Sequence, residues 1–178
     1  IFESLARQFP VCMASDEFHY FPQAVSRAFD WRRWDDFSPG AVADIITRLK
    51  GWEGELQGAV RFSPPPPEDV DRALLLRSVR TLREQLEEVR VHESQPTFYL
   101  TIAGIGLAEA YAAGAGAFDL RLAHLPAFFE QAVGNLSRLP RLFRDLGAEM
   151  LAMQHRWLRS LALPEDRSAP VQRAYERL

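Results

Sequence analysis

The stretch PPPPEDVDRALLLRSVRTLREQLEEVRVHESQP, residues 64–96, decides the fold of this chain. Four prolines lead into a run from Glu68 to His92 that contains neither Gly nor Pro and is rich in residues that favour helix. Within this run apolar residues recur at spacings of three and four, so they share one face of a helix. They are Leu75, Val79, Leu82, Leu86 and Val89. The stretch therefore predicts a long amphipathic helix, about residues 68–92, whose apolar face needs neighbours.

The segment after Pro96 is apolar nearly all round. Residues 97–113 leave no polar face, and a helix of this kind is normally buried inside a protein. Extended to Phe118, the segment reaches about the 20 residues that a membrane span needs, but Ala, Gly, Thr and Glu109 dilute its apolar character. A buried central helix is the favoured interpretation, and a membrane span is the alternative.

Prolines mark the bounds of several further helices. Pro10 is predicted to end a first short helix, and Pro22 to open another. Ser38-Pro39 supplies an N-cap and a first helical position for a helix that ends near Val60. Pro140 starts the last full helix. The inner face predicted for that helix comprises Leu142, Phe143, Leu146, Met150, Met153, Trp157 and Leu161.

No run alternates apolar with polar residues, and neither Asn-Gly nor Asp-Gly occurs, so signals for strands are absent. We predict an all-α fold, an irregular multi-helix bundle around a long central helix (about 68–92) and a buried apolar helix (about 97–113). With 178 residues, 47% of them apolar, residues 1–178 are predicted to form a single helical domain.

Composition argues against several classes of partner and location. The net charge is -3, and the Arg residues alternate with acids, so we expect no nucleic acid partner. The single cysteine rules out an internal disulfide and predicts a reducing, cytoplasmic location. The chain has no initial Met, and Ser168-Ala169-Pro170 predicts a helix start shortly before Leu178. We therefore expect the N-terminal part of a longer protein.

The histidines do not form a recognisable metal motif. The His-Glu-x-x-His motif of zinc peptidases is absent. Two pairs lie close enough in sequence to supply two metal ligands each: Glu88 with His92, and Asp16 with His19. Two ligands are too few for a metal site. We expect no metal and no other cofactor in this segment.

Two further residues have competing interpretations. Apolar Val11 and Met13 flank Cys12, which favours a buried structural thiol over a nucleophile. Glu109 lies on an otherwise apolar helix, so its carboxylate is paired, protonated or facing a cavity. A structural pair and a functional role both stay open for Glu109.

The irregular segment 14–21 is the predicted place of function. It gathers Asp16, Glu17 and His19 with aromatic side chains, and irregular segments carry binding groups more often than helix faces do. The alternative is an aromatic plug that closes one end of the bundle.

Four segments together resemble a known family. They are the stretch from Phe9-Pro10 to His19, the helix start Asp35-Asp36-Phe37-Ser38-Pro39-Gly40-Ala41, the segment Pro96-Thr97-Phe98-Tyr99-Leu100, and Leu125-Pro126-Ala127-Phe128-Phe129-Glu130-Gln131-Ala132-Val133-Gly134-Asn135-Leu136. This pattern resembles the N-terminal half of the bacterial family called domain of unknown function 885. Members are predominantly helical and look like zincin metallopeptidases, with the zinc motif in their C-terminal half.

The resemblance implies that catalytic residues and zinc belong to a part of the protein beyond Leu178. This chain is then the non-catalytic N-terminal domain of a zinc metallopeptidase-like protein, with the C-terminal remainder as its partner and a peptide as a possible substrate. Asp16, Glu17, His19 and Tyr99 are the candidate cleft-lining residues. The alternative is a non-enzymatic helical module that binds a protein partner or a small apolar ligand.

Overall fold

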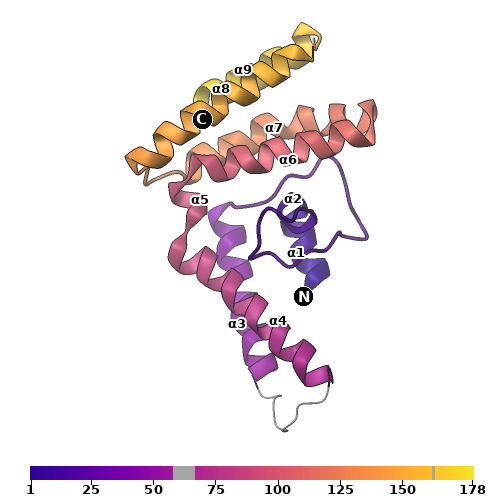
Figure 1. The fold of residues 1–178 in the computed structure, drawn as a ribbon, viewed down its shortest axis with the longest axis vertical. Coiled ribbons are helices and arrows are strands. Elements are labelled where there is room, and N and C mark those ends of the chain that lie inside the picture. The colour runs from indigo at the N-terminus through magenta and orange to yellow at the C-terminus, as the bar shows by residue number, and fades with distance from the viewer. Residues whose placement is uncertain (58–66, 162) are drawn as a thin grey trace.

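The computed structural model describes residues 1–57, 67–161 and 163–178, and within them regular structure is entirely helical. The prediction of an all-α multi-helix bundle is confirmed. Residues 64–66 of the proline run and the helix end predicted near Val60 lie outside the described residues. The helices in Figure 1 are α1 (Phe2–Gln8), α2 (Pro10–Ala14), α3 (Pro39–Gln57), α4 (Pro67–Glu84), α5 (Val91–Ser94), α6 (Pro96–Ala113), α7 (Ala115–Asn135), α8 (Arg141–Ser160) and α9 (Glu165–Arg177), with a π-helical turn η1 (Gln85–Val89) after α4.

Helix α6 is the centre of the fold. It packs against α7, α8, α5 and α2, which is why its sequence has no polar face. Gly106 permits a close approach, because a Cβ atom there would lie 2.7 Å from Cζ3 of Trp34. The predicted buried helix is confirmed. No helix in the described ranges combines the length and the apolar character needed to cross a membrane.

Helices α3 and α4 lie side by side and project from the rest of the molecule (Figure 1). Ion pairs join α3 to α4 and to η1. Glu53 accepts from Arg80 at 2.7 Å and from Arg83 at 3.0 Å in α4, and Lys50 lies 2.6 Å from Glu87 in η1. The apolar face of α4 therefore packs against α3, and we call this projecting pair of helices the arm. Helix α4 does not occupy the central position that we expected. The buried apolar residues of this arm are Val42, Ile45 and Leu49 on one side and Val79, Leu82 and Leu86 on the other.

The helix predicted for residues 68–92 is right up to Val89 and wrong at its last turn. Arg90 has φ 55° and ψ 48°, a left-handed conformation that ends the helix, and α5 starts at Val91. The break has a packing reason. It lets Leu86 face α3 while His92 turns toward α6 and α7, and both side chains are buried.

The segment between α2 and α3 is irregular, and the helix predicted to start at Pro22 does not form. Asp35 anchors this segment, since its carboxylate accepts hydrogen bonds from the backbone N–H groups of Val11 at 2.7 Å and Cys12 at 3.0 Å. These donors belong to the first turn of α2, whose N–H groups need outside partners. Pro10 ends α1 as predicted, but it also starts α2, which the sequence interpretation missed.

The inner face predicted for α8 is only partly correct. Leu142, Leu146 and Met153 are exposed, whereas Gly147 and Leu158 are the buried residues of this helix. The contact with α6 uses small and polar groups as well as apolar ones: a Cβ atom at Gly147 would lie 2.9 Å from Cγ of Pro96. An apolar stripe on the outside of α8 is therefore left without a neighbour in the described part of the chain.

Candidate functional site

A cavity of about 520 Å³ opens where α3, η1, α5 and α7 meet. Helix α3 supplies an apolar wall, and η1 and α5 supply charged and polar groups. A concave site with an apolar wall and a few polar groups is the usual form of a ligand-binding pocket. We call it the junction cavity. It is lined by Phe37, Pro39, Val42, Ala43, Ile46, Leu86, Glu87, Arg90, His92, Glu93, Gly134, Asn135 and Ser137.

His92 is the buried titratable residue of the junction cavity, with 4% of its surface exposed. Its Nε2 atom lies 3.7 Å from Oε1 of Glu93, and its Nδ1 atom has no hydrogen-bond partner in the described residues. Burial lowers the pKa of His92, while the charge of Glu93 raises it and that of Arg90 lowers it. The imidazole is therefore neutral at pH 7, with one N–H group and one free lone pair.

Arg90 stands at the edge of the same cavity. It is the single non-glycine residue with positive φ among the described residues, and such backbone strain often accompanies functional sites. Its guanidinium donates to the carboxylate of Glu93. A π-helical turn, which is likewise frequent at functional sites, immediately precedes it. The edge of the cavity thus carries a cation and an acid beside a neutral imidazole.

A hydrogen-bonded chain fixes the floor of the junction cavity. The Tyr99 hydroxyl donates to the backbone carbonyl of His92 at 2.7 Å. Asn135 donates to the Tyr99 hydroxyl at 2.9 Å and to the carbonyl of Phe37 at 2.8 Å. Burial raises the pKa of Tyr99. Tyr99 is completely buried, so it holds the floor from below and does not line a cleft as we expected.

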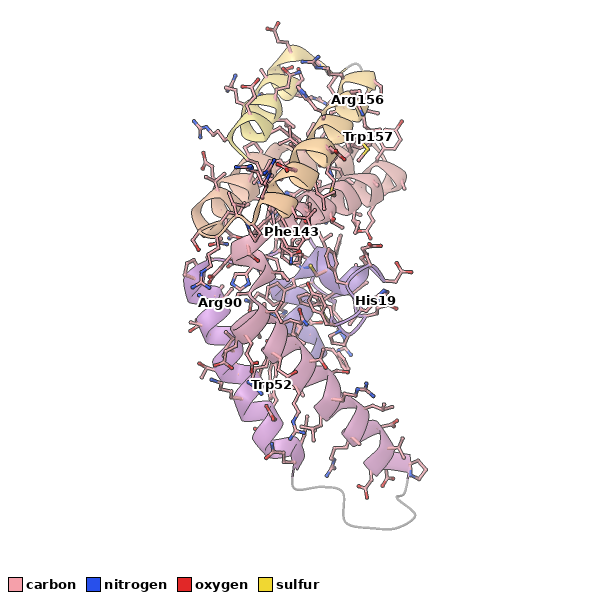
Figure 2. The ribbon with its side chains drawn as sticks, turned by 60° about the vertical axis from the view of Figure 1, so that its left-hand side comes forward. His19, Trp52, Arg90, Phe143, Arg156 and Trp157 are labelled. Atoms are coloured by element: carbon pink, nitrogen blue, oxygen red, sulfur yellow. The ribbon has the colours of Figure 1, made fainter. Side chains whose placement is uncertain are left out.

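The structure brings together only two of the four predicted site residues. Asp16 and Glu17 border an open cavity of about 460 Å³ together with Glu109. Burial raises the pKa of Glu109, and the positive charge of Arg121 opposes this rise. His19 is exposed on the loop after α2, and Figure 2 shows it on the opposite side from Arg90. These carboxylates face a hollow, which is one of the environments predicted for Glu109.

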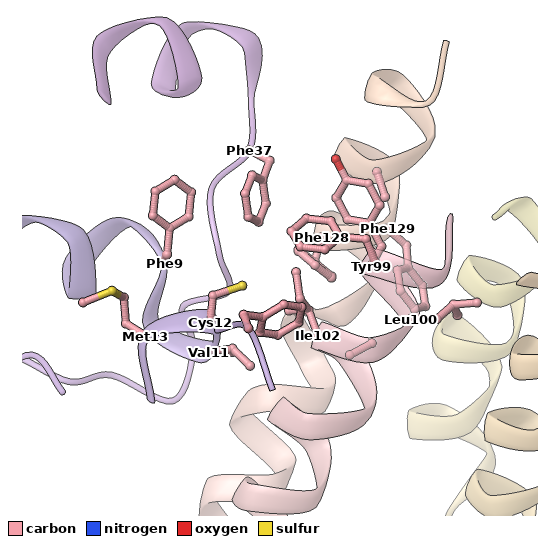
Figure 3. Close-up of a cluster of buried hydrophobic side chains, with 14 of the residues drawn as sticks. Phe9, Val11, Cys12, Met13, Phe37, Tyr99, Leu100, Ile102, Phe128 and Phe129 are labelled. Atoms are coloured by element: carbon pink, nitrogen blue, oxygen red, sulfur yellow. The ribbon is translucent and has the colours of Figure 1, made fainter. Parts of the chain in front are cut away.

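Cys12 is completely buried in the cluster of apolar side chains drawn in Figure 3. Burial raises the pKa of its thiol, and the charge of Asp35 raises it further. A thiol in this environment stays protonated and is a poor nucleophile. The prediction of a buried structural thiol is confirmed.

Arg121 of α7 is a buried cation that the sequence interpretation missed. Its guanidinium lies 4.9 Å from the ring centre of Trp34 and 5.2 Å from that of Trp31, within the range of cation–π interaction. It also donates to the carbonyl of Arg33. Burial lowers the pKa of Arg121, while the charge of Asp35 raises it. These contacts attach the irregular segment before α3 to α7.

Metal ligands are not grouped in the part of the chain that the structure describes. No set of three or more His, Cys, Asp or Glu side chains there has an arrangement that would hold an ion. Glu88 and His92 were one possible pair, but the break at Arg90 separates them, so they do not share a helix face.

The sequence interpretation missed the junction cavity because its lining residues come from three distant segments, 37–46, 86–93 and 134–137. The nearest signal was Asn135, a polar residue one helical turn from Gln131 on an apolar helix. Both side chains bond to the segment before α3: Gln131 accepts from the N–H group of Phe37 at 2.9 Å.

Comparison with known protein families, with characterised proteins and with solved structures gives no match to this chain.

Proposed function

We propose that this chain is the non-catalytic N-terminal helical domain of a zinc metallopeptidase-like protein. In this proposal zinc and the catalytic residues belong to the remainder of that protein, and the junction cavity forms part of the wall of a peptide-binding cleft. The proposal includes a cytoplasmic location, for which the single free cysteine is the support.

The supporting observation is that all four segments of the family resemblance meet at one junction. Phe9 and Phe37 have ring centres 4.8 Å apart. The backbone N–H group of Phe37 donates to Gln131, and its carbonyl accepts from Asn135. Asn135 also bonds to Tyr99. The segments that carry the resemblance thus form one structural unit, as the conserved parts of a family fold would.

The chemistry of the junction cavity suits a peptide. Val42 and Ile46 offer an apolar wall for a side chain, while His92 and Arg90 offer polar groups near a backbone. None of these groups forms a nucleophile–base pair, so their role in this proposal is to bind and orient.

The test is to prepare the protein encoded by the whole reading frame that contains this chain. We expect it to carry a His-Glu-x-x-His motif, to bind zinc and to hydrolyse peptides, whereas residues 1–178 alone do neither. A43E, at an exposed position on the wall of the junction cavity, is expected to raise KM for the peptide and to leave zinc content unchanged, and V25E on an exposed loop is the control. The proposal fails if the reading frame has no zinc motif, or if residues 1–178 alone bind zinc tightly.

A second candidate function is a non-enzymatic helical module that binds a small apolar ligand. The observation in its favour is the apolar α3 wall of the junction cavity, completed by Phe37. Here the chain alone is expected to bind an apolar fluorescent dye, and I46E is expected to abolish that binding. Unchanged dye binding by I46E would contradict a ligand site in this cavity.

A further inference from the structure

The acids that line the junction cavity are already paired with cations of the same chain. Glu87 accepts from Lys50 at 2.6 Å and from Arg83 at 2.9 Å. Glu93 accepts from the guanidinium of Arg90. Among the described residues that line the cavity, a charged ligand group would therefore find no free counter-charge, and burying an unpaired charge is costly. The cavity thus favours an uncharged occupant.

The wall that α3 gives to the junction cavity is apolar. Val42 and Ile46 lie about one turn apart on that helix, and Phe37 and Leu86 extend the apolar surface. The volume of about 520 Å³ lies in the range of sites for small ligands, so it accommodates a large side chain with the backbone beside it. Removal of apolar surface from water is the main favourable term in binding such a side chain.

Gly134 of α7 leaves room for this occupant. It lines the cavity with backbone atoms alone, and a Cβ atom built on it would meet no atom outside its own stretch of helix within 4 Å. Its φ is not positive, so neither close packing nor a special backbone conformation requires glycine here. Glycine inside a helix is less favourable than alanine. What Gly134 contributes to the cavity is the space that a side chain would fill.

We propose that the junction cavity binds one large, uncharged, apolar side chain of a peptide, of the size of leucine or phenylalanine, and that Gly134 sets the upper limit of its size. This inference rests on the proposed function, because it names the class of side chain that the peptide-binding cleft takes at this point. Acidic and basic side chains are disfavoured, since their charges would be buried without a partner. A larger residue in place of Gly134 would compete with the ligand for the same space.

Three blocked amino acids test the selection of side chain by the chain itself. N-acetylphenylalanine amide and N-acetylleucine amide are expected to shift the backbone NMR signals of Asn135 and Ser137, which line the cavity. N-acetylaspartate amide has nearly the shape of the leucine compound but carries a charge. It is expected to bind at least about tenfold more weakly. Equally tight binding of the aspartate compound, or no binding of any of the three, overturns the inference.

The role of Gly134 is tested by filling the space beside it. G134L is expected to weaken binding of the phenylalanine compound by about tenfold or more, because the leucine side chain takes up part of the cavity. G134A is the smaller step, and its affinity should lie between those of the parent and G134L. The matched control is G116L, at an exposed position near the other end of α7 where a Cβ atom likewise meets nothing within 4 Å. It is expected to bind as the parent does.

Circular dichroism checks that every variant keeps its helix content. Unchanged affinity in both G134L and G134A overturns the role of Gly134, as does an equal loss in G116L. These outcomes are distinct from those of the proposed function, which fails on the zinc motif and the zinc content of the whole protein.

Discussion

The side chain of Asn135 donates to the hydroxyl of Tyr99 across 2.9 Å and so ties α7 to α6 beneath the junction cavity. The same amide group donates to the carbonyl of Phe37 at 2.8 Å. One buried amide therefore joins three segments that are far apart in the sequence. The Tyr99 hydroxyl in turn donates a hydrogen bond to the carbonyl of His92, so the position of the cavity floor depends on Asn135.

Asn135→Ala is expected to lower the free energy of unfolding by about 2 kcal/mol, because it removes the donor to the buried carbonyl of Phe37 and the hydrogen bond that the Tyr99 hydroxyl accepts. Urea denaturation followed by circular dichroism measures the change. Val133→Ala, at an exposed position two residues away, is the control and is expected to stay within about 0.5 kcal/mol of the parent. A loss below about 1 kcal/mol for Asn135→Ala would show that water replaces these hydrogen bonds.

Cys12 is expected to resist thiol reagents while the chain is folded. Its thiol is completely buried, and burial raises its pKa, so little thiolate exists and the reagent has no access. Titration with a chromogenic disulfide reagent should release less than about one tenth of an equivalent of coloured thiolate per native chain. After unfolding in urea, it should release about one equivalent per chain. Equal labelling rates in both states would show that the segment around α2 opens readily.

Asp35 is expected to make stability depend on pH. Burial raises the pKa of its carboxyl group to about 6, from 3.8 in the unfolded chain, although hydrogen bonds from Cys12 and Val11 oppose the rise. Between these two values the folded state binds more protons than the unfolded state. The contribution of Asp35 is therefore fully present below about pH 4 and is lost as the pH rises through about 6, a change of about 3 kcal/mol.

Other carboxylates titrate in the same range, so the measured quantity is the difference in unfolding free energy between the parent and Asp35→Asn. This difference should fall as the pH rises from about 4 to about 6 and then level off. Glu3 makes stability change with pH in the opposite direction, because the hydrogen bond from Arg7 lowers the pKa of its carboxyl group. This contribution is the same in both proteins and cancels in the subtraction. A difference that stays constant with pH would mean that Asp35 is ionised at little cost.

The elements with a complete apolar pattern were predictable from sequence. Helix α6 is apolar on all sides, and α3 has an apolar stripe after Pro39. In each case the local sequence predicts which residues are buried, without knowledge of the helices that pack against them. For α8 the same pattern gave the helix but not its orientation. Leu142 and Met153 resemble core residues in sequence, and only the packing of Gly147 against Pro96 shows which side of α8 faces inward.

The candidate site was less predictable because its residues act at long range. The polar and aromatic composition of segment 14–21 predicts a site there, yet the junction cavity depends on His92 and Arg90, which follow an ordinary helical sequence. Arg90 has neither Gly nor Pro beside it, so no local signal marks the helix break. The break comes from the different packing partners of Leu86 and His92, a property of the folded chain.

Arg90 itself provides a direct test of the strain at the junction cavity. A non-glycine residue in the left-handed region is expected to cost about 1 kcal/mol, which glycine avoids. Arg90→Gly and Arg90→Ala both remove the contact with Glu93, so the difference between them isolates the backbone term. We expect Arg90→Gly to unfold at a higher urea concentration than Arg90→Ala, with a free energy of unfolding about 1 kcal/mol larger. If Arg90→Ala proved the more stable variant, the left-handed conformation would not be the one that the folded chain adopts in solution. The parent is expected to lie below Arg90→Gly, because the partly exposed ion pair with Glu93 is worth less than the strain.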